Sequence, residues 1–282
     1  MTTLLLVLFV GALFAGFLGS LTGLGGGVIL VPLLTIGFGI DIRYAIGTSL
    51  ISVIATSSGA ASAFVKEGML NIRIGMFLEI ATTLGALAGA AIAYFAPTHV
   101  IAILFGLVLL YSAAVSFKKS KEEISVPDQS NIKYGRFAQL LKARGTYVDM
   151  AGNQTDYKLQ HAGGGFIVMW VAGLLSGLLG IGSGALKVIA MDSIMKIPFK
   201  VSTTTSNFMI GVTAAASAGV YFSRGYIDPV LSMPVVVGVL GGSLLGARTL
   251  LKSQTKSIRF VFAMVITFLA FEMIYNGIVK NI

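Results

Sequence analysis

Long runs of apolar residues, separated by short polar stretches, fill most of the chain. Two of these runs, at about residues 4–36 and 166–194, are too long for one membrane crossing. A straight helix of the first length would be about 50 Å long, whereas a bilayer core is about 30 Å thick. Each run has a glycine-rich break in its middle, at residues 23–27 and 180–184. We therefore expect each run to form a pair of short helices that meet at a glycine break inside the membrane, where freed backbone groups must be buried or line a watery cavity.

Each broken run is followed by further apolar segments, in the same order in both halves of the chain. They are residues 46–65, 75–95 and 100–117 in the first half, and 203–222, 229–250 and 258–278 in the second. The polar stretch between the halves is rich in Lys and Arg, and its alternation around residues 145–148 indicates a small hairpin. We divide the chain into a first transmembrane repeat (1–117), a polar linker (118–165) and a second transmembrane repeat (166–282).

The two halves match each other when the chain is shifted against itself by 157 positions, which places Gly23 on Gly180. The same shift aligns further glycines and hydroxyl residues: Gly25 and Gly27 with Gly182 and Gly184, Thr48 and Ser49 with Thr205 and Ser206, and Gly85 and Gly89 with Gly242 and Gly246. Shared hydrophobicity alone would not keep glycines and hydroxyls in one register, so we interpret the halves as a duplication.

The positions of Lys and Arg favour one topology. If each broken run counts as two crossings, each half has five, the halves are inverted, and most Lys and Arg lie on the side of the linker. If it counts as one crossing, the basic residues fall on both sides. Because cytoplasmic loops are enriched in Lys and Arg, we favour inverted five-plus-five repeats with a cytoplasmic linker and both termini outside.

Composition supports this class and excludes others. Hydrophobic residues make up 56% of the chain and charged residues 11%, whereas soluble domains carry about 25% charge. We therefore expect an all-α polytopic protein of the plasma (inner) membrane, with the lipid bilayer as a partner. The net charge of +9 fits basic cytoplasmic loops and does not require nucleic acid.

The residues that enzymes and metal sites use are scarce. The chain has no cysteine, and its expected spans have no internal histidine and few carboxylates. An intramembrane enzyme would need a nucleophile with a base, or a set of metal ligands. We therefore expect no catalytic activity, no metal and no cofactor.

The glycine breaks are the first candidate site. Helix N-termini present unpaired N–H groups and the positive end of the helix dipole, so helices starting after the two breaks would aim both at one anion. The residues expected to bind the substrate here are Gly25, Gly26, Gly27, Gly182, Ser183 and Gly184. The alternative is that these glycines only allow helices to cross closely.

Polar residues follow both breaks at matching positions. They are Thr48 and Ser49 in the first half, and Thr205, Ser206 and Asn207 in the second. Their hydroxyl and amide groups could donate hydrogen bonds to an oxyanion, so we include them among the candidate substrate-binding residues. Alternatively they cap a helix or bond back to the preceding turn.

Lys187 is the one basic residue deep in an apolar run, and the equivalent position in the first half is Leu30. A lysine at mid-membrane costs about 2.5–3.5 kcal/mol, so it should face a partner or a cavity. We expect it to pair with a bound anion or with Asp192; the alternative is that it extends to the surface. Glu79 and Asp192 are candidate proton carriers, although Glu79 could lie at the membrane interface.

Two small-residue patterns, Gly85-xxx-Gly89 and Gly242-xxx-Gly246, fit close helix contacts. Such contacts could join the two repeats or two protomers of a homodimer. The sequence leaves both arrangements open.

Three motifs together resemble the TauE/SafE family of sulfite exporters. They are residues 16–27 followed by Pro32, residues 45–50, and residues 177–184. The resemblance implies a secondary transporter that exports sulfite or a small organosulfur anion such as a sulfonate, by alternating access and coupled to protons. The long linker departs from the family pattern, as does Ser183 within the second break, which suggests two non-equivalent half-sites. An anion channel, or a membrane sensor whose central loop recruits a partner, are the alternatives.

Overall fold

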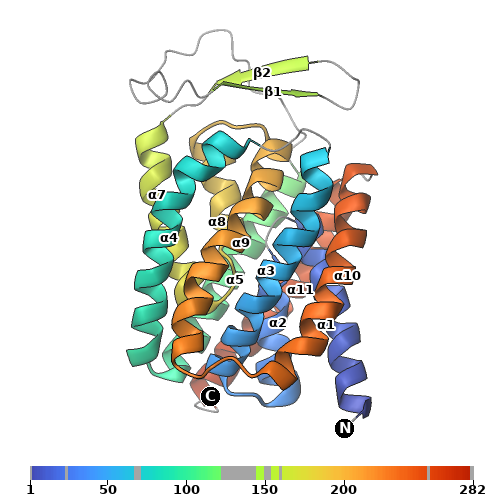
Figure 1. Ribbon diagram of the computed structural model, residues 1–282, viewed down its shortest axis with the longest axis vertical. Coiled ribbons are helices and arrows are strands. Elements are labelled where there is room, and N and C mark those ends of the chain that lie inside the picture. The colour runs from blue at the N-terminus through green and yellow to red at the C-terminus, as the bar shows by residue number, and fades with distance from the viewer. Residues whose placement is uncertain are drawn as a thin grey trace.

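Two sets of helices, one from each half of the chain, form a single bundle that carries a small β-hairpin at one end (Figure 1). The computed structural model describes residues 2–22, 25–66, 71–121, 144–148, 154–158, 161–252 and 255–279. The first half contains α1 (Thr2–Thr22), α2 (Gly27–Pro32), the π-helix η1 (Leu33–Gly37), α3 (Ile42–Lys66), α4 (Ile72–Phe95) and α5 (Thr98–Lys121). The second contains α7 (Ala162–Leu179), α8 (Gly184–Ile189), the π-helix η2 (Ala190–Ile194), α9 (Phe199–Ser223), α10 (Pro229–Lys252) and α11 (Thr255–Val279).

The helices agree with the apolar pattern of the sequence. Among the described residues, 5 helices are long and apolar enough to cross a membrane, and they lie in α3, α4, α5, α7 and α10. Shorter apolar stretches lie in α1, in α2 with η1, and in α11. The prediction of a multi-pass membrane protein with a helical membrane part is confirmed.

The hairpin expected in the linker is also present. Strand β1 (Arg144–Val148) pairs antiparallel with β2 (Gln154–Lys158), with Thr146 opposite Asp156. It is placed beyond one end of the bundle (Figure 1).

The broken segments differ from the prediction of two short helices. α1 has 21 residues and α7 has 18, so the first member of each pair is a full-length helix. Only the second member is short, with 6 residues of α-helix that continue into 5 residues of π-helix. The prediction was wrong because the apolar run before each glycine break is long enough to make a complete helix. The π-turn does not depend on Pro32, because Ile189 stands at the equivalent position in the second half.

Left-handed backbone ends the long helix and redirects the chain at the second break. Gly180 has φ +68° and its N–H donates to the carbonyl of Ser176, which caps α7. Gly182 (φ +69°) and Ser183 (φ +48°) then turn the chain into α8. Gly25 of the first break has the same hand, with φ +77°. Glycine adopts this conformation without the steric cost of a Cβ, which explains the glycines at positions 25, 180 and 182, whereas Ser183 adopts it at a cost in strain.

The halves interlock, because helices of one half pack on helices of the other. α1 lies along α10, and α7 lies along α4, at opposite sides of the bundle (Figure 1). α3 packs on α9 and α5 on α11, so each of these contacts pairs elements that the 157-position shift makes equivalent. The starts of α1 and α7 lie at opposite ends of the bundle, and the end of α11 lies with the start of α1, away from the hairpin (Figure 1).

Glycines make the closest of these contacts. A Cβ at Gly85 or Gly89 would collide with the backbone of α7 at Trp170 and Leu174. A Cβ at Gly242 or Gly246 would collide with α1 at the equivalent residues, Leu13 and Phe17. The two Gly-xxx-Gly patterns therefore join the two halves of one chain, which decides between the arrangements left open by the sequence.

Candidate functional site

The two glycine breaks meet inside the bundle. A Cβ on Gly25 would lie 3.4 Å from Ile210 and 3.6 Å from Val53, and one on Gly182 would contact the same two side chains. Val53 of α3 and Ile210 of α9 are equivalent residues of the two halves and are fully or almost fully buried. The structure therefore brings Gly25 and Gly182 together around one pair of side chains.

Serine hydroxyl groups of α3 and α9 donate hydrogen bonds to the backbone of the second break. Ser49 Oγ of α3 donates a 2.8 Å hydrogen bond to the carbonyl of Gly180, and Gly27 packs against both of these groups. Ser206 Oγ of α9 donates a 3.3 Å hydrogen bond to the carbonyl of Gly184, which is the first residue of α8. Serines at the same position of the two halves thus both donate to the second break, one at each end of it.

Asn207 also lies at the breaks, because its Nδ2 donates to the carbonyl of Ser20 at the end of α1, at 3.5 Å. Thr48 and Thr205 have other contacts. Thr48 Oγ1 accepts from Ser232 of α10, and Thr205 Oγ1 accepts from the N–H of Asn71 before α4. The hydrogen bonds of these two threonines therefore hold neighbouring helices together.

Three buried serine hydroxyls next to the breaks have no hydrogen-bond partner among the described residues. They are Ser20 at the end of α1, Ser176 near the end of α7, and Ser183 at the start of α8. All three are at most 1% exposed. A buried polar group without a partner is costly, so these oxygens are available to a polar ligand. Sequence reasoning missed Ser20 and Ser176, although both lie within four residues of a glycine break.

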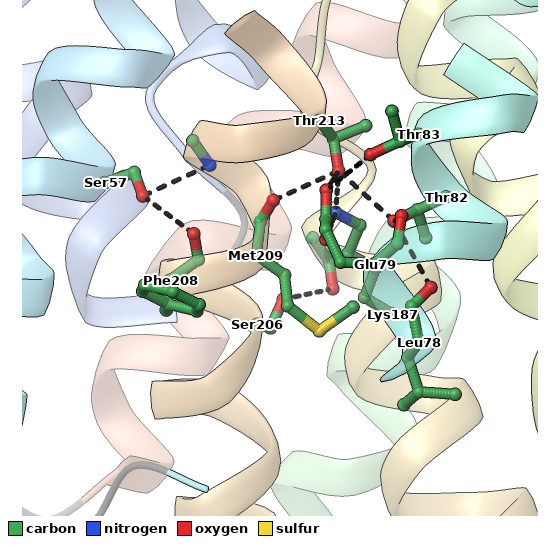
Figure 2. A network of polar contacts seen from close by, with 12 residues as sticks. Ser57, Leu78, Glu79, Thr82, Thr83, Lys187, Ser206, Phe208, Met209 and Thr213 are labelled. Carbon is green, nitrogen blue, oxygen red and sulfur yellow. Dashed lines mark hydrogen bonds and ion pairs between the residues drawn. The ribbon is translucent and has the colours of Figure 1, made fainter. Parts of the chain in front are cut away.

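A separate polar network surrounds Lys187 (Figure 2). Lys187 is 0% exposed, and its Nζ donates a 2.5 Å hydrogen bond to Thr213 Oγ1 of α9. Nζ lies 3.6 Å from Oε2 of Glu79 on α4, an ion-pair distance. Thr213 Oγ1 also lies 2.5 Å from Oε1 of Glu79, and Thr83 Oγ1 donates to the same carboxylate oxygen at 3.3 Å. The cluster thus joins α4, α8 and α9.

This network corrects two expectations. Glu79 is 5% exposed, so its carboxylate lies inside the bundle and not on its outer surface. Lys187 does not reach the surface, and it forms its ion pair with Glu79 rather than the one expected with Asp192, which is half-buried in η2. The sequence could not pair Lys187 with Glu79, because only the packing of α4 against the second half brings them together.

Thr213 was missed as well. The repeat contained a signal for it, because the equivalent residue of the first half is Thr56. Among the described residues, no group of three His, Cys, Asp or Glu side chains is placed to hold a metal ion.

The described residues thus form a multi-pass helical bundle that buries an ion pair between two interlocked halves, together with hydroxyls that have no partner among these residues. These are features of a membrane protein that handles polar solutes. The chain belongs to the sulfite exporter TauE/SafE family, whose model matches residues 8–273. The family resemblance seen in the sequence is therefore confirmed.

Similar proteins occur in bacteria and archaea. The probable membrane transporter protein YunE of Bacillus subtilis is 30% identical over 96% of this chain and 98% of its own length. YdhB of the same organism is 27% identical, over 87% of this chain and 88% of its own. MJ0441 of Methanocaldococcus jannaschii is 24% identical, over 93% and 92%. YdhB and MJ0441 are described, like YunE, as probable membrane transporter proteins. The chain is therefore a member of a membrane transporter family. No solved structure matches the chain.

Proposed function

We propose that the protein is a secondary transporter that exports sulfite or a small organosulfur anion, such as a sulfonate, across the plasma (inner) membrane. The observation that carries this proposal is the meeting of both glycine breaks at Val53 and Ile210, beside buried hydroxyls that have no hydrogen-bond partner within the described part of the chain. Such broken helices occur in membranes where the backbone lines a substrate site. The family description supplies the sulfur anion and the direction of export.

The anion site in this proposal combines both halves. Backbone N–H groups of residues 25–27 and 182–184 face an oxyanion, and the hydroxyl of Ser183 donates to it. Ser49, Ser206 and Asn207 have hydrogen bonds to backbone carbonyls, which they exchange for the anion when it binds. Thr48 and Thr205 hold α3 and α9 in place through their hydrogen bonds to Ser232 and to the N–H of Asn71. Lys187 supplies the positive charge, and Glu79 and Asp192 are the proton carriers.

Alternating access in this proposal uses inverted five-plus-five repeats, residues 1–117 and 166–282, with the linker on the cytoplasmic side. The reciprocal packing of α1 on α10 and of α7 on α4 supports a two-fold relation between the halves. The position of the start of α1 and the end of α11, both away from the hairpin, supports an odd number of crossings per half (Figure 1). Rocking of one half against the other would open the site first to one side and then to the other.

The test is flux in liposomes that contain the purified protein. Sulfite, thiosulfate, methanesulfonate, sulfate and acetate are compared, with and without a pH gradient. We expect saturable flux of one sulfur anion that responds to the pH gradient and is reduced in Ser183→Ala. Flux that does not saturate would favour a channel, and binding without flux would favour a sensor. Failure of every anion to bind or move would contradict the proposed substrate class.

A further inference from the structure

The ion pair between Lys187 and Glu79 is incomplete. An ammonium group has three N–H donors, and the described contacts of Lys187 Nζ use one, on Thr213. The 3.6 Å between Nζ and Glu79 Oε2 is too long for a hydrogen bond, and Oε2 accepts no hydrogen bond from the described residues. The two charges are therefore connected mainly through the hydroxyl of Thr213, which lies between them (Figure 2).

The position that the repeat makes equivalent, on α2, α3 and α10, shows what is present where there is no ion pair. The residues equivalent to Lys187, Glu79 and Thr213 are Leu30, Val236 and Thr56. Leu30 is fully buried, and Thr56 donates its hydroxyl to the carbonyl of Ser52 on its own helix at 2.9 Å. Apolar side chains therefore fill the equivalent position in the same fold. Because a buried ion pair is costly and can often be replaced by apolar residues, packing does not explain the charges in the second half.

The ion pair is also next to a break. Lys187 lies in the first turn of α8, and its N–H donates to the carbonyl of Ser183, whose own hydroxyl has no partner among the described residues. Ser206, which bonds to Gly184, appears in the same view as Glu79 and Lys187 (Figure 2). The ammonium group is thus attached to the segment that the proposed anion site uses.

We propose that Glu79 occupies the anion position beside Lys187, and that protonation of Glu79 releases Lys187 to bind the transported anion. This inference rests on the proposed function and adds a mechanism of proton coupling to it. The carboxylate and the anion compete for one ammonium group, with Thr213 as the shared hydrogen-bond partner.

The charges of the site balance in both states. Lys187 with ionised Glu79 has no net charge, and Lys187 with protonated Glu79 and a bound monovalent anion has none either. A net charge inside the membrane is therefore avoided at each stage, in line with its high cost. One proton accompanies each monovalent anion, and both move in the same direction. The direction of flux is then set by the concentration gradients of the anion and the proton together, so a pH gradient changes it.

Other charged groups on the helices around the pair are farther along the chain. Arg73 is six residues before Glu79 on α4, Asp192 is five residues after Lys187, and Arg224 follows the end of α9. At about 1.5 Å per residue along a helix, Arg73 is roughly 9 Å from Glu79 and Asp192 roughly 8 Å from Lys187. Arg224 is farther away, beyond the end of α9. His161 lies at the start of α7 and Lys196 after η2. Asp192 is therefore the other carboxylate to test as the proton carrier.

The experiment measures binding of methanesulfonate to the purified full chain across a range of pH. Sulfonates stay monoanionic throughout, so any pH dependence belongs to the protein. In the wild type, we expect the Kd to rise about tenfold per pH unit once Glu79 is ionised, as expected for one linked proton. Glu79→Gln should bind more tightly at high pH, with an affinity that does not change with pH. Its flux in liposomes should no longer respond to a pH gradient.

A second variant keeps the test independent of folding. Lys187→Leu with Glu79→Val reproduces the residues of the equivalent position, Leu30 and Val236, so we expect it to fold with a Tm close to that of the wild type and to lose methanesulfonate binding. Unchanged binding in this double variant would overturn the proposal. So would a Glu79→Gln variant with the wild-type pH dependence, or loss of pH dependence in Asp192→Asn instead.

Failure of this inference can be distinguished from failure of the proposed function. If the wild type transports a sulfur anion but these variants leave its pH dependence intact, only the competition between Glu79 and the anion is wrong. If the wild type binds and moves none of the tested anions, including methanesulfonate, the proposed function fails and the inference fails with it.

Discussion

At the scale of single residues, the buried ion pair between Lys187 and Glu79 gives the first prediction about stability. Lys187→Leu alone would leave the carboxylate of Glu79 buried, with 6% of its side chain exposed, and without its cation. Breaking a buried ion pair in this way costs about 3–5 kcal/mol. We expect the single variant to unfold at a much lower temperature in detergent, and the double variant with Glu79→Val to recover most of the loss. If the two single losses simply add in the double variant, the charges are not coupled.

A hydroxyl group at a break gives a second prediction at this scale. Ser49→Ala would leave the buried carbonyl of Gly180 without its 2.8 Å hydrogen bond. An unsatisfied buried group costs about 1–3 kcal/mol, so we expect a loss of stability of that size in chemical unfolding. Ser58 is the matched control on the same helix, because it is exposed and its hydroxyl donates to the carbonyl of Ile54, one turn earlier in the helix. Ser58→Ala should change stability by less than about 0.5 kcal/mol; equal losses at the two sites would contradict a role for Ser49 at the break.

At the scale of helices, adjacent glycines of α10 make a direct comparison possible. A Cβ at Gly242 would overlap the carbonyl of Leu13 on α1, whereas one at Gly241 would meet nothing within 4 Å. Gly241→Ala should therefore stabilise the helix by up to about 1 kcal/mol, because alanine favours helices. Gly242→Ala should destabilise the protein by about 1–3 kcal/mol, because it forces α1 and α10 apart. Unfolding of both variants in one detergent checks this, and two gains in stability would show that α1 and α10 are not in contact here.

Helices were the part of the fold that the sequence predicted best. The apolar segments at residues 46–65 and 75–95 correspond to α3 and α4, whose bounds differ from them by at most four residues. The π-helices and the full length of α1 were not predicted. Periodicity identifies an apolar helix, but it does not say where backbone hydrogen bonding changes from one type to another.

At the scale of the whole molecule, the repeat explains why some of the site was predicted and some was not. Ser49 and Ser206 were found because the same residue type recurs after both breaks. The pair of Lys187 with Glu79 breaks the symmetry, and its members lie on α8 and α4, which come together only because the halves interlock. A pattern within one helix contains no information about such a contact. The repeat thus predicts the shared framework, and the tertiary structure supplies the asymmetric site.

The topology of the whole molecule gives the last prediction. The start of α1 and the end of α11 lie away from the hairpin, so inverted repeats place them outside when the hairpin is in the cytoplasm (Figure 1). The chain has no cysteine, so a single introduced thiol can be labelled without background. We expect Val279→Cys to react with a membrane-impermeant reagent added to intact cells, and Thr146→Cys in β1 to react only after the membrane is opened. Reaction of both thiols from the same side would mean that α11 ends on the side of the hairpin. The halves would then run in parallel, and alternating access by inverted repeats would be excluded, although the packing of the two breaks around Val53 and Ile210 would be unaffected.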